Sequence, residues 1–322
     1  MPIVCCVLVQ QTDAEVIQDT TRNREMSKYS NNTDNQTKWF KREVRALQEE
    51  GQRIANNTHG ISVAPLIISK DQNVQMSGVI AVFPKREAPL FFQGARKTRA
   101  MTGETALDNN PNSLANIGKD PEKVLLAINN VSHTERQLIS NVLDKNIRAG
   151  TFHIYTYEPP CCKNSDTNAN FSCCQYYAHL IRHFPEIEFH VYFDLTDFKS
   201  LAKYFEFQTS ADLEWLCHLI QNTGKYEQIL SKWNCSSDTS ARDDKQRLRD
   251  LCEAKTLQQP LPEDVVKRIA AEIFNCIQKV DPTLPISAKH VDAIETFFKN
   301  KIISFADHGG NQPQNLFIHI IQ

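Results

Sequence analysis

The chain lacks three features that would indicate a membrane protein, a polycation or a repeat architecture. No apolar run approaches the roughly 18 residues that a membrane-spanning helix needs. The formal net charge of −2 gives no global electrostatic attraction to nucleic acid or to an anionic membrane. No internal repeat is visible. We therefore expect a soluble protein with no membrane partner, in which any contact with nucleic acid is local.

The N-terminal segment also lacks the marks of a signal peptide. Residues 1–11 are largely apolar, but no basic region precedes them and no small-residue cleavage site follows. Six Asn-x-Ser/Thr sequons and ten cysteines point the other way, because both are frequent in secreted proteins. The localisation is therefore open: we expect no signal peptide, and secretion remains an alternative.

What is present is an ordinary globular composition, with 41% apolar and 23% charged residues, in a chain long enough for one large or two ordinary domains. Residues 1–59 form a polar segment with one expected helix at 39–54. Residues 60–200 form the expected core, with an insertion at 84–130. Residues 201–322 are expected to be a helical C-terminal extension.

The core combines strand and helix patterns, which predicts the α/β class. Two β-branched runs, 60–70 and 77–85, are predicted to form a hairpin. A regular helix is expected over 132–150, then a strand over 151–160, a helix over 174–184 and a strand over 186–195. Short connections between a strand, a helix and a strand favour a parallel pair with a right-handed crossover.

Beyond residue 200 the periodicity is helical. Helices are predicted at 212–221, 241–255, 263–280 and 288–303. The second of these is rich in charges of both signs, which we interpret as a solvated helix face without a function.

The start of the 132–150 helix, Ser132-His133-Thr134-Glu135, has two interpretations. Ser132 and Glu135 match a capping box, in which each side chain satisfies a backbone N–H of the first turn. By itself this motif needs no function for His133. The cysteines that follow in the chain favour a second interpretation, in which His133 is a metal ligand.

Cys161 follows the next predicted strand, and Cys174 lies at the start of the helix after it. Helices of one parallel sheet can point their first turns at a common crevice. The imidazole of His133 and the thiolates of Cys161 and Cys174 suit zinc and leave the fourth tetrahedral position for water. Zinc brings the pKa of bound water towards neutrality, and Glu135 is placed to move the proton.

His133-Thr134-Glu135, followed by Pro160-Cys161 and a helix-opening cysteine, resembles the H-x-E…P-C-x-x-C signature of the zinc-dependent cytidine deaminase superfamily. The order of elements over residues 60–200 is also similar to that family's core. The aromatic segments around the cysteines most resemble the AID/APOBEC-like branch and its bacterial toxin relatives.

This resemblance implies a three-layer core, with a mixed sheet and helices on both faces. It implies a hydrolase that deaminates a nucleobase, most simply cytosine to uracil, in single-stranded DNA or RNA or in a nucleoside or nucleotide. Zn²⁺ would be held by His133, Cys161 and Cys174, with Glu135 as general acid and base.

One departure from the family pattern concerns the spacing of the cysteines. The family has two residues between its cysteines, whereas twelve separate Cys161 from Cys174 here. We interpret residues 162–173 as an inserted loop, which a Cys162–Cys173 disulfide would close. Cys173 remains an alternative to Cys174 as the third ligand.

Residues 83–99 could supply a platform for a nucleic-acid substrate. Phe83, Phe91 and Phe92 would stack bases and nearby Lys and Arg side chains would neutralise phosphates. The alternative is an exposed loop with a few apolar anchors. His179 and His183, spaced i, i+4, could bind a metal, but the sequence shows no carboxylate motif beside them.

Two other functions remain open. One is a catalytically inactive, disulfide-stabilised secreted binding protein of deaminase-like fold. The other is a structural zinc site with a fourth protein ligand from the cysteine cluster. The sequence does not specify the base, the polymer or the oligomeric state.

Overall fold

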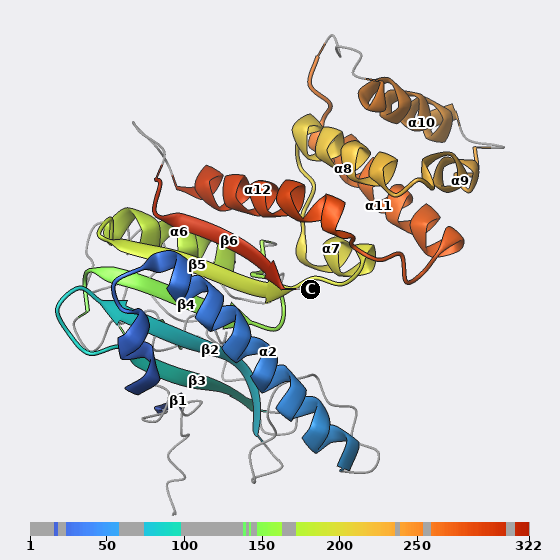
Figure 1. The fold of residues 1–322 in the computed structure, drawn as a ribbon. Coiled ribbons are helices and arrows are strands. Elements are labelled where there is room, and N and C mark those ends of the chain that lie inside the picture. The colour runs from blue at the N-terminus through green and yellow to red at the C-terminus, as the bar shows by residue number, and fades with distance from the viewer. Residues whose placement is uncertain are drawn as a thin grey trace, which may run out of the picture. The chain divides into compact units, whose positions relative to one another are not determined.

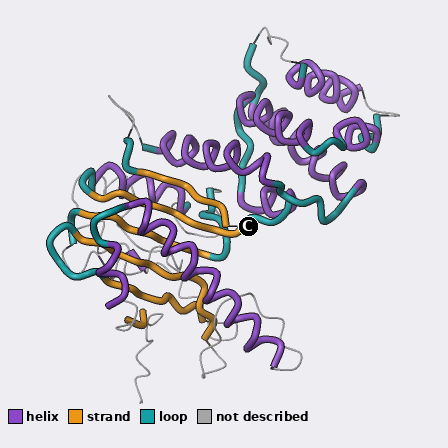
Figure 2. Tube along the Cα trace, viewed as in Figure 1, coloured by secondary structure: helices purple, strands orange, loops and turns teal. Residues whose placement is uncertain are grey.

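The computed structural model describes residues 16–18, 24–57, 74–97, 138–139, 142, 147–162, 172–235, 239–253, 259–306 and 313–321 (Figure 1). The chain is an α/β protein with antiparallel and parallel strand pairs, as the alternation of helix and strand in Figure 2 shows. The predicted α/β class is confirmed. The chain divides into two compact units, Met1–Asn109 with Lys119–Tyr155, and Asn110–Gly118 with Thr156–Gln322. This division falls inside the predicted 60–200 core.

The first unit contains strands β1 (Val16–Gln18), β2 (Val74–Pro84), β3 (Leu90–Lys97) and most of β4 (Gly150–Thr156), in the order β1-β3-β2-β4. β3 pairs antiparallel with both β1 and β2. The predicted strand at 77–85 is therefore confirmed. The strand predicted at 60–70 lies outside the described residues.

β3 corrects two expectations about the segment after β2. The insertion was predicted to begin at residue 84, yet Leu90–Lys97 pairs with β2. Phe83, Phe91 and Phe92 are all buried, so they do not form an exposed platform for bases. The short turn after β2 returns the chain to the sheet, and the phenylalanines are core residues.

Helix α2 (Thr33–Asn57) covers the aromatic residues of this unit. It confirms the helix predicted at 39–54 and extends beyond it at both ends. Trp39 meets Phe83 and Phe91 edge-on, with ring centroids 6.1 and 6.2 Å apart. The short helix η1 (Ser27–Tyr29) precedes α2. The apolar stripe of α2 was visible in the sequence because Trp39 and its neighbours recur at helical spacing.

The predicted helix at 132–150 is described at only a few positions. Leu138, Ile139 and Val142 are helical and buried, and Ile147 is buried beyond them. These four residues belong to the predicted apolar face. His133 and Glu135 lie outside the described residues.

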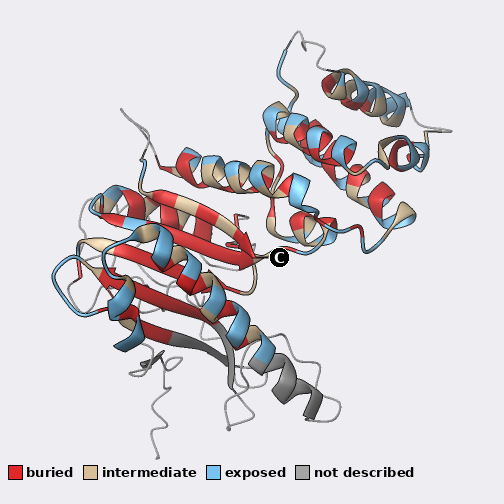
Figure 3. Ribbon diagram, viewed as in Figure 1, coloured by how far each residue is buried: buried red, intermediate tan, exposed pale blue. Residues whose placement is uncertain are grey.

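The second unit contains a parallel strand pair, β5 (Ile187–Asp194) and β6 (Leu316–Ile321). β6 corrects the expectation that residues 201–322 are entirely helical. Helix α12 (Ala288–Phe305) packs against β6, and Phe298 contacts Phe193 of β5 with ring centroids 4.7 Å apart. The two strands are mostly buried (Figure 3).

The other helices of this unit are α6 (Cys173–His183), α7 (Phe198–Tyr204), α8 (Ser210–Asn222), α9 (Tyr226–Ser231), α10 (Thr239–Cys252) and α11 (Glu263–Val280). The helix predicted at 263–280 has these bounds. Those predicted at 174–184, 212–221, 241–255 and 288–303 are confirmed with shifted ends.

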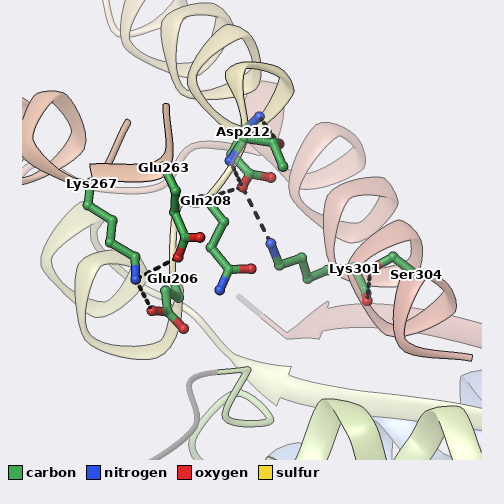
Figure 4. Close-up of polar contacts among 8 residues, drawn as sticks. Glu206, Gln208, Asp212, Glu263, Lys267, Lys301 and Ser304 are labelled. Carbon is green, nitrogen blue, oxygen red and sulfur yellow. Dashed lines mark hydrogen bonds and ion pairs between the residues drawn. The ribbon is translucent and has the colours of Figure 1, made fainter. Parts of the chain in front are cut away.

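Polar contacts link the helices of the second unit at their ends (Figure 4). The Asp212 carboxylate at the start of α8 accepts hydrogen bonds from the backbone N–H groups of Gln208 and Thr209, and Lys301 of α12 lies 3.4 Å away. A disulfide joins Cys217 of α8 to Cys252 of α10. Within the described ranges, no helix has both the length and the apolar character for a membrane span.

Candidate metal centre

The segment that leaves β4 and carries Cys161 is held by backbone hydrogen bonds. The Asp194 N–H donates to the Tyr157 carbonyl at 3.3 Å, and the Cys162 N–H donates to the Tyr204 carbonyl at 3.3 Å. Glu158 pairs with Lys203 of α7 at 2.8 Å, although both side chains are largely exposed. The end of β5 and helix α7 therefore fix the backbone on both sides of Cys161.

The first turn of α6 is closed by a capping box. The Ser172 hydroxyl accepts from the Gln175 N–H at 3.3 Å, and the Ser172 N–H donates to the Gln175 side chain at 2.8 Å. Ser172 is buried. The cap orders the turn that carries Cys173 and Cys174, because it satisfies N–H groups that have no partner inside the helix.

Cys161 lies directly against this first turn. Its sulfur accepts a hydrogen bond from the Cys173 N–H at 3.2 Å, and its carbonyl accepts from the Cys174 N–H at 3.1 Å. A helix N-terminus and a donated N–H both favour negative charge on the sulfur. The fold thus brings Cys161 to the start of α6, although residues 162–172 lie between them in the sequence.

The pairing of the other cysteines differs from the prediction. Cys162 is bonded to Cys174, with Cα atoms 5.0 Å apart, so the predicted Cys162–Cys173 disulfide is wrong. Cys161 and Cys173 are thiols, the first half-buried and the second buried. The sequence could not distinguish these pairings, because each of Cys162, Cys173 and Cys174 lies next to another cysteine.

The donor chemistry fits zinc in part. Cys161 has the thiol, the position and the N–H donor that a thiolate ligand needs. Cys174 can donate as a thiolate only after its disulfide is reduced, whereas Cys173, the predicted alternative, already carries a thiol. Cys161 and Cys173 therefore carry the thiols in this structure, and Cys174 would carry one only after reduction.

The remaining members of the predicted site, His133 and Glu135, lie outside the described residues, so their roles remain predictions. Within the described part of the chain, no group of three or more His, Cys, Asp or Glu side chains could hold a metal ion.

Two tyrosines flank the strand end that leads to Cys161. Tyr155 is fully buried, and its hydroxyl accepts a hydrogen bond from Gln48 at 2.9 Å, so it belongs to the core of the first unit. Burial, followed by the charges of Asp194, Glu158 and Asp197, raises the pKa of Tyr157. Tyr157 therefore keeps its phenolic proton at neutral pH and remains a hydrogen-bond donor beside the cysteine segment.

Comparisons of the chain with models of known protein families, with curated proteins and with solved structures found no match.

Sequence reasoning missed the Ser172 cap, although a signal for it was present. Ser172 and Gln175 are three residues apart at the start of an apolar helix, which is the spacing of a capping box. The hydrogen bond from the Cys173 N–H to the Cys161 sulfur had no comparable signal, because the two residues are 12 positions apart and the bond depends on tertiary structure.

Proposed function

We propose that the protein is a zinc-dependent hydrolase that deaminates a nucleobase, converting cytosine to uracil in single-stranded DNA or RNA or in a nucleoside or nucleotide. The observation that carries the proposal is the contact of Cys161 with the opening turn of α6. It supports a shared metal site, because two cysteine ligands must meet in space whatever the chain length between them.

The proposed ligands are His133, Cys161 and a cysteine of the α6 opening turn, either Cys174 after reduction of its disulfide or Cys173. When bound, the zinc ion would supply a Lewis acid that brings the pKa of a bound water towards neutrality. Tyr157 follows β4 in the segment that leads to Cys161 and would be able to donate a hydrogen bond to a substrate.

Glu135 would carry the proton transfers. Water adds to C4 of cytosine, the bond from C4 to the amino nitrogen breaks, and uracil and ammonia are the products. Glu135 accepts one proton of the attacking water and delivers it to the ring nitrogen N3; it then takes the proton of the hydroxyl group now on C4 and delivers it to the amino nitrogen, which leaves as ammonia. It does not bind the metal in this scheme, so its loss should leave the zinc in place.

A second candidate is the inactive, disulfide-stabilised binding protein. It is favoured by the two disulfides, Cys162–Cys174 and Cys217–Cys252, which are compatible with secretion. In that case the cysteine cluster serves stability, and the protein binds no zinc.

The test is zinc content per chain and uracil formation on single-stranded DNA, single-stranded RNA and cytidine, with the protein reduced and folded. We expect about one zinc in wild type that is lost in Cys161→Ala. Glu135→Gln should retain zinc and lose about 10²- to 10⁴-fold in turnover, the usual contribution of a general acid and base.

Glu214→Gln, at an exposed position of α8, is the matched control and should behave as wild type. A reduced, folded protein that binds no zinc and forms no uracil would contradict the deaminase and favour the binding protein. Zinc in Cys173→Ala but not in Cys174→Ala would identify Cys174 as the third ligand, and the opposite pattern would identify Cys173.

A further inference from the structure

One face of α6 carries two histidines one helical turn apart. His179 and His183 are both half-buried, and their rings stack with centroids 5.4 Å apart and planes inclined by 18°. The i, i+4 spacing places both side chains on one face of the helix. From this pair we infer that His179 and His183 form a bidentate site for a divalent transition-metal ion, separate from the candidate metal centre.

The ring separation is close to what chelation requires. With metal–nitrogen bonds of about 2.1 Å and an angle of about 90 to 110° at the ion, two imidazole centroids lie about 4.5 to 5.3 Å apart. The 5.4 Å separation of the His179 and His183 ring centroids lies just above that range. A small change in the side-chain torsion angles would remove the difference. Chelation also requires both rings, whose planes are now inclined by 18°, to turn about their side-chain bonds until one nitrogen of each points at the same ion.

One ring nitrogen of the pair has no other partner. Nε2 of His183 is buried and has no hydrogen-bond partner among the described residues. Burial lowers the pKa of both histidines, and the neighbouring Arg182 charge acts in the same direction. Both rings are therefore neutral at pH 7, which is the form that binds metal.

The backbone that carries His183 is anchored. The Asn315 side chain donates hydrogen bonds to the carbonyls of Ile181, Phe184 and Ile187, at 3.3, 3.3 and 2.9 Å. The bonds to Ile181 and Phe184 hold the last turn of α6. The backbone that carries His183 is therefore ordered before a metal binds. Arg182 lies beside the pair but is exposed, and water screens its charge.

The two metal sites would lie apart along α6, one at its first turn and the other over its second half. At a rise of about 1.5 Å per residue, His179 and His183 are about 7.5 and 13.5 Å along the helix axis from Cys174. Two imidazoles suit copper, nickel and zinc, with water completing the coordination. The Irving–Williams order predicts a higher affinity for Cu²⁺ than for Ni²⁺ or Zn²⁺. Ni²⁺ is the better probe, because Cu²⁺ oxidises thiols.

The experiment is equilibrium dialysis of the full chain against Ni²⁺ at pH 7.5, with ions counted per chain. Wild type should bind one more Ni²⁺ than either His179→Gln or His183→Gln. His218→Gln, at an exposed position of α8, is the matched control and should bind as many ions as wild type. Circular dichroism verifies that each variant is folded, and either histidine variant suffices for the comparison.

A second readout is the melting temperature in excess Ni²⁺. It should rise in wild type and in His218→Gln by more than in the two α6 variants, because an ion that binds the folded chain stabilises it. Equal Ni²⁺ counts in wild type and both α6 variants would overturn the inference. Since the readout is a difference between variants, it holds whether or not Cys161 and His133 also bind metal.

Discussion

Asp244 of α10 places a carboxylate in the interior of the helical region, within a segment that the sequence indicated to be a solvated face. Its side chain is 2% exposed, and Arg268 of α11 donates to it through Nε at 2.6 Å and a terminal nitrogen at 3.2 Å. Arg247 adds a third contact at 3.1 Å. Charge patterning could not reveal this burial, because it depends on the packing of α10 against α11.

Substitution of Arg268 should therefore lower the free energy of unfolding markedly. Arg268→Met leaves a buried charge with one remaining partner, and we expect a loss of about 3 kcal/mol in the free energy of unfolding. Arg247→Met removes a single contact and should cost less. Urea denaturation measures both, with the exposed Arg249→Met as control. An equal, small effect of all three substitutions would show that the pair contributes little.

His190 of β5 links stability to pH. Burial lowers its pKa to about 4, and its Nδ1 lies 3.1 Å from Nε2 of His319 in β6. The unfolded chain, with an ordinary histidine pKa of about 6.5, binds the proton more tightly than the folded chain. Stability is therefore lost as pH falls from about 6.5 to 4, by about 3 kcal/mol in total.

Stability curves of wild type and His190→Gln between pH 7.5 and 4.5 test this linkage. The variant should lose stability less steeply on acidification, although it is less stable than wild type at pH 7.5. His218→Gln, whose histidine is exposed, should keep the slope of wild type. Identical slopes in all three proteins would mean that His190 does not titrate in this range.

At the scale of elements, periodicity predicted the long helices well because each has a continuous apolar stripe. The bounds predicted for α11 match those observed, from the acidic first turn to Lys279 in the last. β3 was missed because its apolar residues lie next to turn-forming and charged residues, so the local pattern is not that of a strand. Its strand conformation depends on hydrogen bonding to β2. β6 was missed for the same reason, since its place beside β5 is a long-range contact.

The capping box of α6 gives a prediction that joins stability to the candidate metal centre. Ser172→Ala should cost about 1 kcal/mol, the usual value of an N-cap. It should also lower zinc occupancy, because the same turn presents Cys173 and Cys174 to Cys161. Thermal unfolding and zinc content at limiting zinc measure the two effects.

Thr209→Ala is the matched control, because Thr209 caps α8 with an equivalent box. It should reduce stability by a similar amount and leave zinc occupancy unchanged. Equal zinc content in both variants would mean that the cap of α6 does not order the proposed ligands.

At the scale of the whole molecule, the α/β class and the order of most elements could be predicted, because both follow from local periodicity. The gathering of Cys161, Cys162, Cys173 and Cys174 at the start of α6 was only partly predicted: resemblance to a family motif brought Cys161 and Cys174 together, but not the bond between Cys162 and Cys174. Disulfide choice depends on distances of a few ångströms between sulfur atoms, which local pattern does not contain.

Both disulfides found among the described residues lie in the second unit, and their reduction should have opposite effects on stability and on metal binding. In the chain-entropy model, closing the 35-residue separation of Cys217 and Cys252 is worth about 4 kcal/mol and the 12-residue separation of Cys162 and Cys174 about 3 kcal/mol. A dithiol reductant should therefore lower the melting temperature of wild type, and Cys217→Ser/Cys252→Ser should reproduce much of that loss without reductant.

If Cys174 is the third zinc ligand, the same reductant should raise zinc occupancy in wild type, because it converts Cys174 to a thiol. Melting temperature and zinc content measured across a series of redox buffers distinguish the proposals: a fall in stability with no gain in zinc at any potential would favour Cys173 as the ligand or the binding protein that holds no zinc.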